Sequence, residues 1–389
     1  MNTDKASRQA RLWLPLVDSA YTLAVRERVR ELVEPHAEAI DRDDIYPKSI
    51  VKQLAALGYT SVTLPVQYGG QGLSFEHALA AFEEIAVASA AVAVSMISIF
   101  QAQTMIRLFG NERLKETFLP QFPQGLLAAY ALTEASHGSD IRSLDTKAER
   151  AGDEWVLAGE KHFITSSDGA ELFVILAQTE VGVSVFAVPR AAAGLTIYEG
   201  RNSATFGLRN GPHMNLRLQD VRIPAHHLIG TEGKGVRQAV TVLDHSRTIA
   251  AAISLGIARA AFDAAYAHVA ERVAFDQKVL QFQGIQWYLA EALSDIDACR
   301  LQVFHAGRAL DQHLDIDRYS SEAKLRAAEV ATRTASMAVQ VGGAIGTMVN
   351  APFGRFLRDA KTYEIAGGSS EILKNTIGKY LIRLTQAPQ

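Results

Sequence analysis

The sequence has almost no cysteine, no strong charge bias and no long uninterrupted apolar run. Cys299 is the single cysteine among 389 residues, which excludes an intrachain disulfide and a thiolate metal cluster. We therefore expect a reducing compartment, the cytoplasm. The formal net charge of −3 predicts no nucleic-acid partner and no anionic membrane surface.

The most apolar stretch, Ala90 to Phe109, is interrupted by polar residues and favours a buried helix over a membrane span. The N-terminus shows no basic region followed by an apolar core, so we predict no secretory signal.

The composition changes twice along the chain and predicts three parts: residues 1–128, 129–235 and 236–389. Helical periodicity marks the first and third parts, with segments at 24–40 (broken near Pro35), 47–57, 92–108, 236–271, 281–313, 320–342 and 369–384. Short β-type runs mark the second part, at 154–158, 172–178, 183–188, 195–199 and 214–221. These patterns predict an α+β multidomain protein, with N-terminal helices, a small antiparallel sheet or barrel and a C-terminal helical bundle.

Three motifs carry the chemical information. Residues 130–140 read Y-A-L-T-E-A-S-H-G-S-D, a turn of small and polar residues whose N–H groups and hydroxyls suit an anion or the polar edge of a ring. Residues 160–166 read E-K-H-F-I-T-S, and residues 358–372 read R-D-A-K-T-Y-E-I-A-G-G-S-S-E-I. Each motif alone is a weak signal, but together and in this order they resemble the acyl-CoA dehydrogenase family of flavoproteins, from about Ala24 to Ile382.

The resemblance implies a non-covalent FAD. A flavin ring needs apolar walls, hydrogen bonds along its N5–O4 edge and partners for its pyrophosphate. The family motifs place Leu132 and Thr133 at the polar edge of the ring, Ser139 near the pyrophosphate, Phe163 where many relatives have Trp, and Thr165 near N5. The full set of implied cofactor residues is Leu132, Thr133, Ser139, Phe163, Thr165, Arg272, Phe275, Gln283, Gln340, Gly343, Ser369 and Glu371.

Two segments of the third part depart from the family pattern. Residues 272–283 match R-x-x-F-G followed by an apolar stretch ending in Gln, but Asp276 replaces the usual Gly and Lys278 the usual Pro. Residues 340–346 resemble Q-x-x-G-G-x-G, with Ala344 at the second Gly position, where close backbone approach favours Gly. In the family these segments reach the flavin of a neighbouring subunit, so the resemblance implies a homodimer or homotetramer.

The substrate implied is an acyl thioester, carried on CoA or on an acyl carrier protein. Asp244 and Arg247 keep the family's spacing for contacts with the thioester's arm and share one helix face. Ser139 is a further implied substrate contact. An electron-transfer flavoprotein is the electron acceptor implied by analogy. We predict no metal site.

The base expected in this family is missing. Dehydrogenation removes a weakly acidic α-proton, which calls for a carboxylate of raised pKa in a poorly solvated pocket. Most relatives supply a Glu in the tail motif, where this chain has Gly367. Other relatives carry the Glu on an earlier helix, where this chain has Ser246. A serine hydroxyl cannot accept the proton without a base of its own, so the catalytic residue is not assigned.

Three hypotheses remain open. The chain dehydrogenates an acyl thioester with a base from elsewhere, the nearby candidates being Asp244, His245, Glu364 and Glu371. Alternatively, it performs different flavin-site chemistry such as elimination, although the helix before Arg107 offers no cation for a leaving group. The third hypothesis is a non-catalytic flavin-binding subunit of a mixed oligomer.

Overall fold

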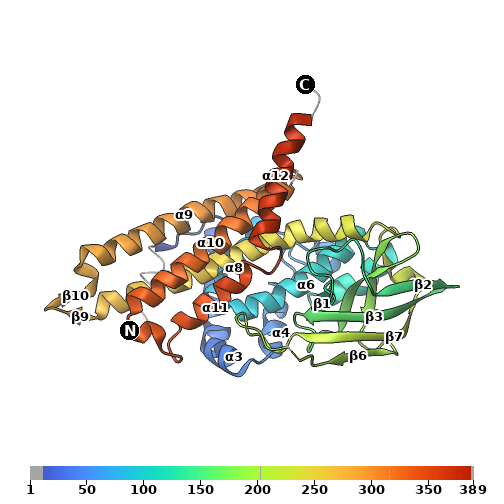
Figure 1. Ribbon diagram of the computed structural model, residues 1–389, viewed down its shortest axis with the longest axis horizontal. Coiled ribbons are helices and arrows are strands. Elements are labelled where there is room, and N and C mark those ends of the chain that lie inside the picture. Colours follow the sequence, from blue (N-terminus) through green and yellow to red (C-terminus); the bar gives the residue numbers. More distant parts are fainter. Residues whose placement is uncertain (1–11, 202, 315, 387–389) are drawn as a thin grey trace. The chain divides into compact units, whose positions relative to one another are not determined.

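A computed structural model describes residues 12–201, 203–314 and 316–386 (Figure 1). The chain divides into two compact units, and each combines segments that are far apart in the sequence. The helical unit contains Met1–Glu38, Phe75–Ala90 and Arg247–Gln389, and the sheet unit contains Ala39–Ser74 and Ala91–Ser246. The predicted order of helices, strands and helices is confirmed. The boundaries predicted at residues 128 and 235 remain predictions, because the two units group the chain in a different way.

The sheet unit is built on an eight-stranded sheet with the order β6-β7-β3-β2-β4-β5-β8, with β1 paired to β4. Its strands are β1 (Ala128–Ala131), β2 (Lys147–Ala151), β3 (Glu154–Ile164), β4 (Leu172–Gln178), β5 (Val183–Pro189), β6 (Leu195–Tyr198), β7 (Met214–Pro224) and β8 (Leu228–Ile229). The sheet is mostly antiparallel, as expected, but β4 pairs in parallel with both β1 and β2. The continuous apolar run of β4 fits this central position, where both faces are buried.

Alternate side chains along β3 point into the core of the sheet unit. Trp155 and Leu157 point into a cluster with Phe173, Phe186 and Val221, and all five are buried. The same unit contains helices α4 (Lys48–Ala56), α6 (Ala90–Phe109) and α7 (Glu112–Phe118), and three short 3₁₀ turns, η2 (Val66–Tyr68), η3 (Leu119–Gln121) and η4 (Ala225–His227).

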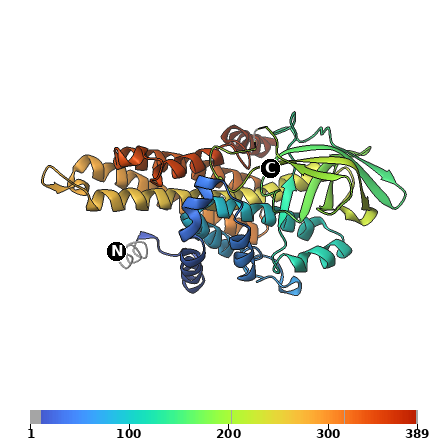
Figure 2. The same cartoon turned by 90° about the horizontal axis from the view of Figure 1, so that it is seen from below.

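The helical unit has α9 (Gln283–Asp311) and α10 (Ile316–Gly342) lying side by side (Figure 2). Its other elements are α2 (Ser19–Leu32), η1 (Glu34–His36), α5 (Phe75–Ala88), β9 (Val273–Ala274), β10 (Gln277–Lys278), η5 (Val279–Gln281), η6 (Ile345–Thr347), α11 (Phe353–Tyr363) and α12 (Ser370–Gln386). Helix α3 (Ala37–Asp43) follows η1, so the break predicted near Pro35 is confirmed. Helix α8 (Gly235–Glu271) begins in the sheet unit and ends in the helical unit. Helix α11 was not predicted.

Helices α6 and α8 are long and apolar enough to cross a membrane by length and composition alone. However, 78% and 89% of their most apolar windows are buried. Burial of this extent is typical of core helices in a folded protein, in agreement with the prediction from the polar interruptions in α6.

A buried charge network ties the helical unit together. Glu84 of α5 accepts hydrogen bonds from Arg26 of α2 and Arg259 of α8, at 2.9 Å in both cases. Glu83 accepts from Arg259 at 2.8 Å and from Arg300 of α9 at 2.9 Å. Burial alone would raise the pKa of Glu84, but the two arginines outweigh it and hold the pKa at about 2. Four helices from distant parts of the sequence therefore share one ionic core.

Candidate active site

The first motif is held in place by a buried ion pair in the sheet unit. The Lys161 ammonium group lies 2.7 Å from Glu134 Oε1 and 3.2 Å from the Leu132 carbonyl oxygen. Glu134 also accepts from the backbone N–H groups of Asp145 at 2.6 Å and Thr146 at 3.0 Å. Burial lowers the pKa of Lys161 to about 8, although the charge of Glu134 opposes this shift. The pair fixes both ends of the loop that follows β1.

The second motif lies beside the first. The His162 N–H donates to the Thr133 carbonyl at 2.9 Å, which brings Leu132 and Thr133 next to Phe163. The β3–β7 register shifts between Lys161 and Ile164, and this bulge leaves Phe163 at φ +57° with 49% of its surface exposed. A bulky residue with positive φ is strained, and such strain gathers at functional sites. The structure therefore displays an aromatic face beside the polar turn.

Asn215 of β7 holds the backbone of Phe163 by a hydrogen bond and was not predicted from the sequence. Its Oδ1 accepts from the Phe163 N–H at 3.3 Å. Thr165 is half-buried two residues further on, and Ser139 is exposed in the loop after Thr133. The roles predicted for these residues toward a cofactor remain predictions.

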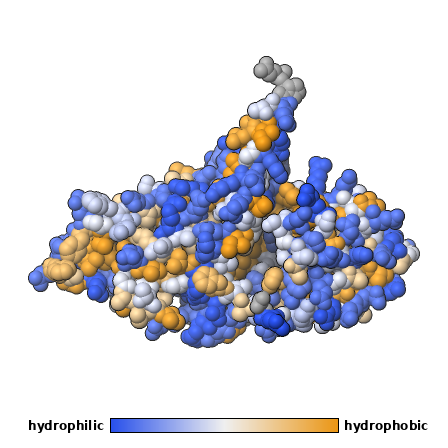
Figure 3. Space-filling view, viewed as in Figure 1, coloured by the Kyte–Doolittle hydropathy of each residue, from blue (hydrophilic) through white to orange (hydrophobic). Residues whose placement is uncertain are grey.

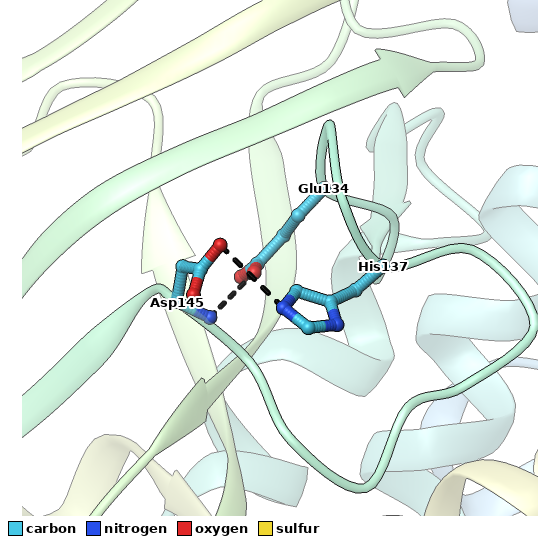
Figure 4. Close-up of side chains that lie close together, drawn as sticks. All are labelled: Glu134, His137 and Asp145. Carbon is cyan, nitrogen blue, oxygen red and sulfur yellow. Dashed lines mark hydrogen bonds and ion pairs between the residues drawn. The ribbon is translucent and has the colours of Figure 1, made fainter.

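Glu134, His137 and Asp145 form a group whose oxygen and nitrogen atoms lie within 4.8 Å of one another. Figure 4 shows the three side chains pointing toward a common centre. His137 Nε2 lies 3.5 Å from Asp145 Oδ2, which also accepts from the Ser136 hydroxyl at 2.8 Å. The carboxylate of Glu134 already accepts three N–H donors, one from an ammonium group. A bound cation would compete with the Lys161 ammonium group for this carboxylate. We therefore interpret the three side chains as a group that stabilises the loop.

Ser246, at one of the two expected base positions, has its hydroxyl fully engaged in the sheet unit. It is 2% exposed on α8, donates to the Leu243 carbonyl at 3.2 Å and accepts from Gln101 Nε2 of α6 at 3.1 Å. A hydroxyl that donates to a backbone carbonyl has no base to take its proton. The geometry therefore supports no proton-acceptor role for Ser246.

The neighbouring candidates on α8 are constrained as well. His245 Nδ1 lies 2.9 Å from the Thr241 carbonyl, and burial lowers the pKa of His245 to about 4, with Arg107 contributing in the same direction. A neutral imidazole of such low pKa is a weak base toward an α-proton. Asp244 is 5% exposed and lies one residue before it.

The tail motif in the helical unit forms a fixed loop. Gly367, at the other expected base position, has φ +71°, and Gly368 has φ +107°. A Cβ built on Gly367 would meet nothing within 4 Å, so the place of the missing side chain is open space. Arg247 Nε donates to the Gly367 carbonyl at 3.2 Å, and Lys324 Nζ donates to the Gly368 carbonyl at 2.6 Å.

The two carboxylates near this loop have other partners. Glu364 accepts from Lys361 at 2.6 Å; burial raises its pKa, but the hydrogen bond and the charge of Lys361 outweigh burial and lower it overall. Glu371 is exposed in the first turn of α12, and hydrogen bonds from its own N–H and from the Ser369 hydroxyl lower its pKa. A base for this reaction needs a raised pKa, and both shifts go the opposite way.

The segment at 272–283 is a hairpin at the far end of α8. Phe275 and Asp276 have φ +50° and +61°, which is the left-handed pair of a type I′ turn. Asp tolerates this conformation, so the turn forms without the family's Gly. Phe275 is 90% exposed and meets Phe282 edge-on, with ring centroids 6.1 Å apart. Arg272 and Gln283 are exposed at its base.

The predicted cofactor residues of the helical unit lie at two places. Gln340 and Gly343 are exposed at the end of α10. A Cβ added to Gly342 would lie 3.5 Å from the ring of Phe353, which also meets His268 edge-on near the hairpin, with ring centroids 6.3 Å apart. Ser369 follows the loop that Lys324 contacts. Lys324 lies on α10, sixteen residues before Gln340. At 1.5 Å per residue the two places are separated by roughly 24 Å.

Comparisons with known proteins cover most of the chain. Three consecutive segments match the models described as acyl-CoA dehydrogenase N-terminal domain (residues 19–125), middle domain (129–221) and C-terminal domain (233–382). A probable acyl-CoA dehydrogenase, YngJ of Bacillus subtilis (strain 168), is 34% identical over 371 residues, with 92% of this chain and 97% of that protein covered. The mitochondrial isovaleryl-CoA dehydrogenase of Pongo abelii is 32% identical, with 96% and 92% covered.

Solved structures agree with the sequence comparisons. The butyryl-CoA dehydrogenase of Megasphaera elsdenii superimposes with a TM-score of 0.91 at 30% identity, covering 94% of this chain and 99% of that one. A glutaryl-coenzyme A dehydrogenase in complex with glutaryl-CoA superimposes with a TM-score of 0.90 at 29% identity, covering 93% and 94%.

Proposed function

Because the chain belongs to the acyl-CoA dehydrogenase family, we propose that it catalyses α,β-dehydrogenation of an acyl thioester carried on CoA or on an acyl carrier protein. Members of this family are flavoenzymes that bind FAD. When bound, FAD supplies the hydride acceptor. The observation that carries the proposal is the pairing of the Leu132–Thr133 turn with the displayed Phe163.

The sheet unit fits one side of a flavin. Phe163 offers an exposed aromatic face on a strained bulge, and the half-buried Leu132, Thr133 and Thr165 lie beside it. An aromatic wall next to hydroxyl and backbone donors is what an isoalloxazine requires. We propose that these four residues hold the ring, with Ser139 toward the pyrophosphate.

We also propose that the protein is a homodimer or homotetramer in which each flavin site uses two chains. The separation of roughly 24 Å along α10 prevents Ser369 and Gln340 of one chain from serving the same small region. The helical unit also carries exposed apolar side chains, namely Phe275, Trp287, Tyr288, Leu301, Leu381, Ile382 and Leu384. Figure 3 shows apolar surface on the outer part of α12, where it leaves the bundle. A second copy would cover such surface.

The helical unit offers donors for a thioester carbonyl. Among the described residues, the N–H groups of Gly368 and Ser369 have no acceptor within hydrogen-bonding distance. Two adjacent N–H groups beside a helix N-terminus favour developing negative charge on an oxygen atom. We propose that they polarise the thioester, and that Asp244 and Arg247 contact its arm.

The second candidate function is a member that binds flavin and thioester without dehydrogenating. The hydrogen bonds and pKa shifts of the four candidate residues favour this function, because none of them combines an available lone pair with a raised pKa. These residues are Ser246, His245, Glu364 and Glu371. If dehydrogenation does occur, we propose an electron-transfer flavoprotein as the acceptor, and the cytoplasm as the compartment.

One experiment separates these functions. The purified protein, loaded with FAD, is mixed without oxygen with a panel of acyl-CoA and acyl-carrier-protein thioesters while the visible flavin spectrum is recorded. Bleaching supports dehydrogenation, and a shifted but unbleached spectrum supports the binding-only function. A protein that stays colourless with excess FAD contradicts both.

A further inference from the structure

Two buried cations converge on successive carbonyls of the tail loop. Arg247, which is 7% exposed, donates to the Gly367 carbonyl at 3.2 Å, and Lys324, which is 0% exposed, donates to the Gly368 carbonyl at 2.6 Å. Both cations come from long helices, α8 and α10, so the loop is attached to rigid elements on one side. The contact of Lys324 lies immediately next to the open space at Gly367.

This arrangement determines where the N–H groups of the loop point. In a trans peptide the carbonyl and the N–H point in opposite directions. With the Gly367 and Gly368 carbonyls turned toward cations, the N–H groups of Gly368 and Ser369 are turned away from them. Glycines at φ +71° and +107° have many alternative conformations. Without the two donors, nothing in the glycine backbone itself would select this one.

We propose that Lys324 is a positioning residue, which together with Arg247 orients the peptide groups of residues 367–369 to receive the oxygen of an acyl thioester. This inference rests on the proposed function for the identity of the ligand, but the ordering of the loop does not depend on it.

The cost of burying Lys324 argues against a purely structural role. Burial lowers the pKa of Lys324 to about 7, with the charge of Arg247 in the same direction, while Glu364 and Glu371 oppose the shift. Removal of a buried charge is costly when it leaves an opposite charge unpaired, but the hydrogen-bond partner of Lys324 is a neutral backbone carbonyl. If Lys324 served stability alone, an apolar residue would serve equally well.

The test uses the full-length, FAD-loaded protein and the variant Lys324→Met. Amide hydrogen exchange is measured for the peptide covering residues 361–372, together with the thermal unfolding midpoint and the dissociation constant for an acyl-CoA, obtained from the flavin spectral shift. Lys374→Met is the matched control, because Lys374 pairs with Glu329 at the surface, where 60% of its side chain is exposed.

For Lys324→Met we expect at least tenfold faster exchange of Ile365, Ala366 and Ser370, whose N–H groups are hydrogen-bonded within the loop, at least tenfold weaker acyl-CoA binding and an unfolding midpoint that is unchanged or raised. Lys374→Met should leave all three as in the wild type. Unchanged exchange of the loop in Lys324→Met would overturn the proposal, and so would faster exchange across the whole chain with a lowered midpoint. If Lys324→Met does not fold, Lys324→Gln is used with the same criteria. A wild-type protein without any response to acyl-CoA would contradict the proposed function, while the exchange result would still test the positioning role.

Discussion

Gln101 Nε2 donates a hydrogen bond to Ser246 Oγ across 3.1 Å, joining α6 to α8 at an expected base position. The contact occupies the hydroxyl of Ser246 and places an amide beside Cβ of residue 246. A longer side chain at position 246 would therefore meet a polar neighbour.

Ser246→Glu should restore a base. The new carboxylate would be buried, which raises its pKa toward the range useful for proton abstraction, and it could accept the Gln101 amide. We expect anaerobic bleaching of the flavin by an acyl-CoA that leaves the wild type unbleached. Ser246→Gln is the control, having the same shape without a basic oxygen. Equal behaviour of the two variants would show that the missing base does not limit the reaction.

Gly367→Ala should destabilise the protein although space is available. The loss comes from φ +71°, a conformation that costs a residue with a Cβ about 1 kcal/mol relative to Gly. Gly284→Ala is the contrast, because Gly284 lies in the first turn of α9 with nothing within 4 Å of a new Cβ; that change should be neutral or stabilising. Denaturant unfolding of both variants measures the difference, and a neutral Gly367→Ala would contradict the prediction.

Arg259→Met should destabilise the helical unit strongly. The change leaves Glu83 and Glu84 buried without one of their shared donors, and breaking a buried pair in this way costs about 3–5 kcal/mol. Arg308→Met removes an exposed partner of Glu76 and should cost about 0–1 kcal/mol. Equal unfolding free energies for the two variants would show that the buried network does not stabilise the fold.

Stability should fall with acid below pH 6.5 because of two half-buried histidines. Burial lowers the pKa of both His213 and His245 from 6.5 to about 4. Between these values the unfolded chain binds protons that the folded protein does not, so the unfolding free energy decreases as the pH falls, by up to about 1.4 kcal/mol per pH unit for each histidine. His213→Asn and His245→Asn should each reduce the slope between pH 6.5 and 5 by about one proton. An unaltered slope in either variant would contradict the prediction for that residue.

Phe163→Ala should weaken FAD binding without loss of stability. Phe163 is 49% exposed, so its ring contributes little to the core of the sheet unit. Its removal would delete the aromatic side chain that we propose packs against the flavin ring. We expect at least about tenfold weaker binding, measured by flavin fluorescence. Phe206→Ala removes another exposed ring of the sheet unit, 65% exposed, and should leave the affinity unchanged. Parallel effects of the two changes would refute the role of Phe163.

The order of the elements could be predicted because long helices and short strands have different hydrophobic periods. Strand β4 was predicted with both ends correct, at Leu172 and Gln178. Strand β2 was missed because K-A-E-R-A has a single buried residue, Ala148. Its parallel pairing with β4 is a long-range choice that no local pattern encodes.

The two buried lysines were missed for a different reason. A lysine is expected at the solvent-exposed surface unless the pattern indicates otherwise. At both positions the hydrophobic pattern does indicate burial. Lys161 has the same parity along β3 as the inward-facing Trp155 and Leu157, and Lys324 lies on the helical stripe that contains Ala327 and Ala331. A charge in register with an apolar face indicates a buried partner, and in both cases that partner includes a backbone carbonyl beside a motif.

The ionic core of the helical unit also limits how this protein can be divided. A fragment of residues 19–125, the length of the N-terminal family segment, would retain Glu83 and Glu84 but lose Arg259 and Arg300. Its two carboxylates would then lie in an apolar interior without most of their cations, a state that favours unfolding or aggregation of the fragment. A chimera of this protein with a relative therefore needs to keep α2, α5, α8 and α9 together, because a crossover at a segment boundary would separate Glu83 and Glu84 from their arginines.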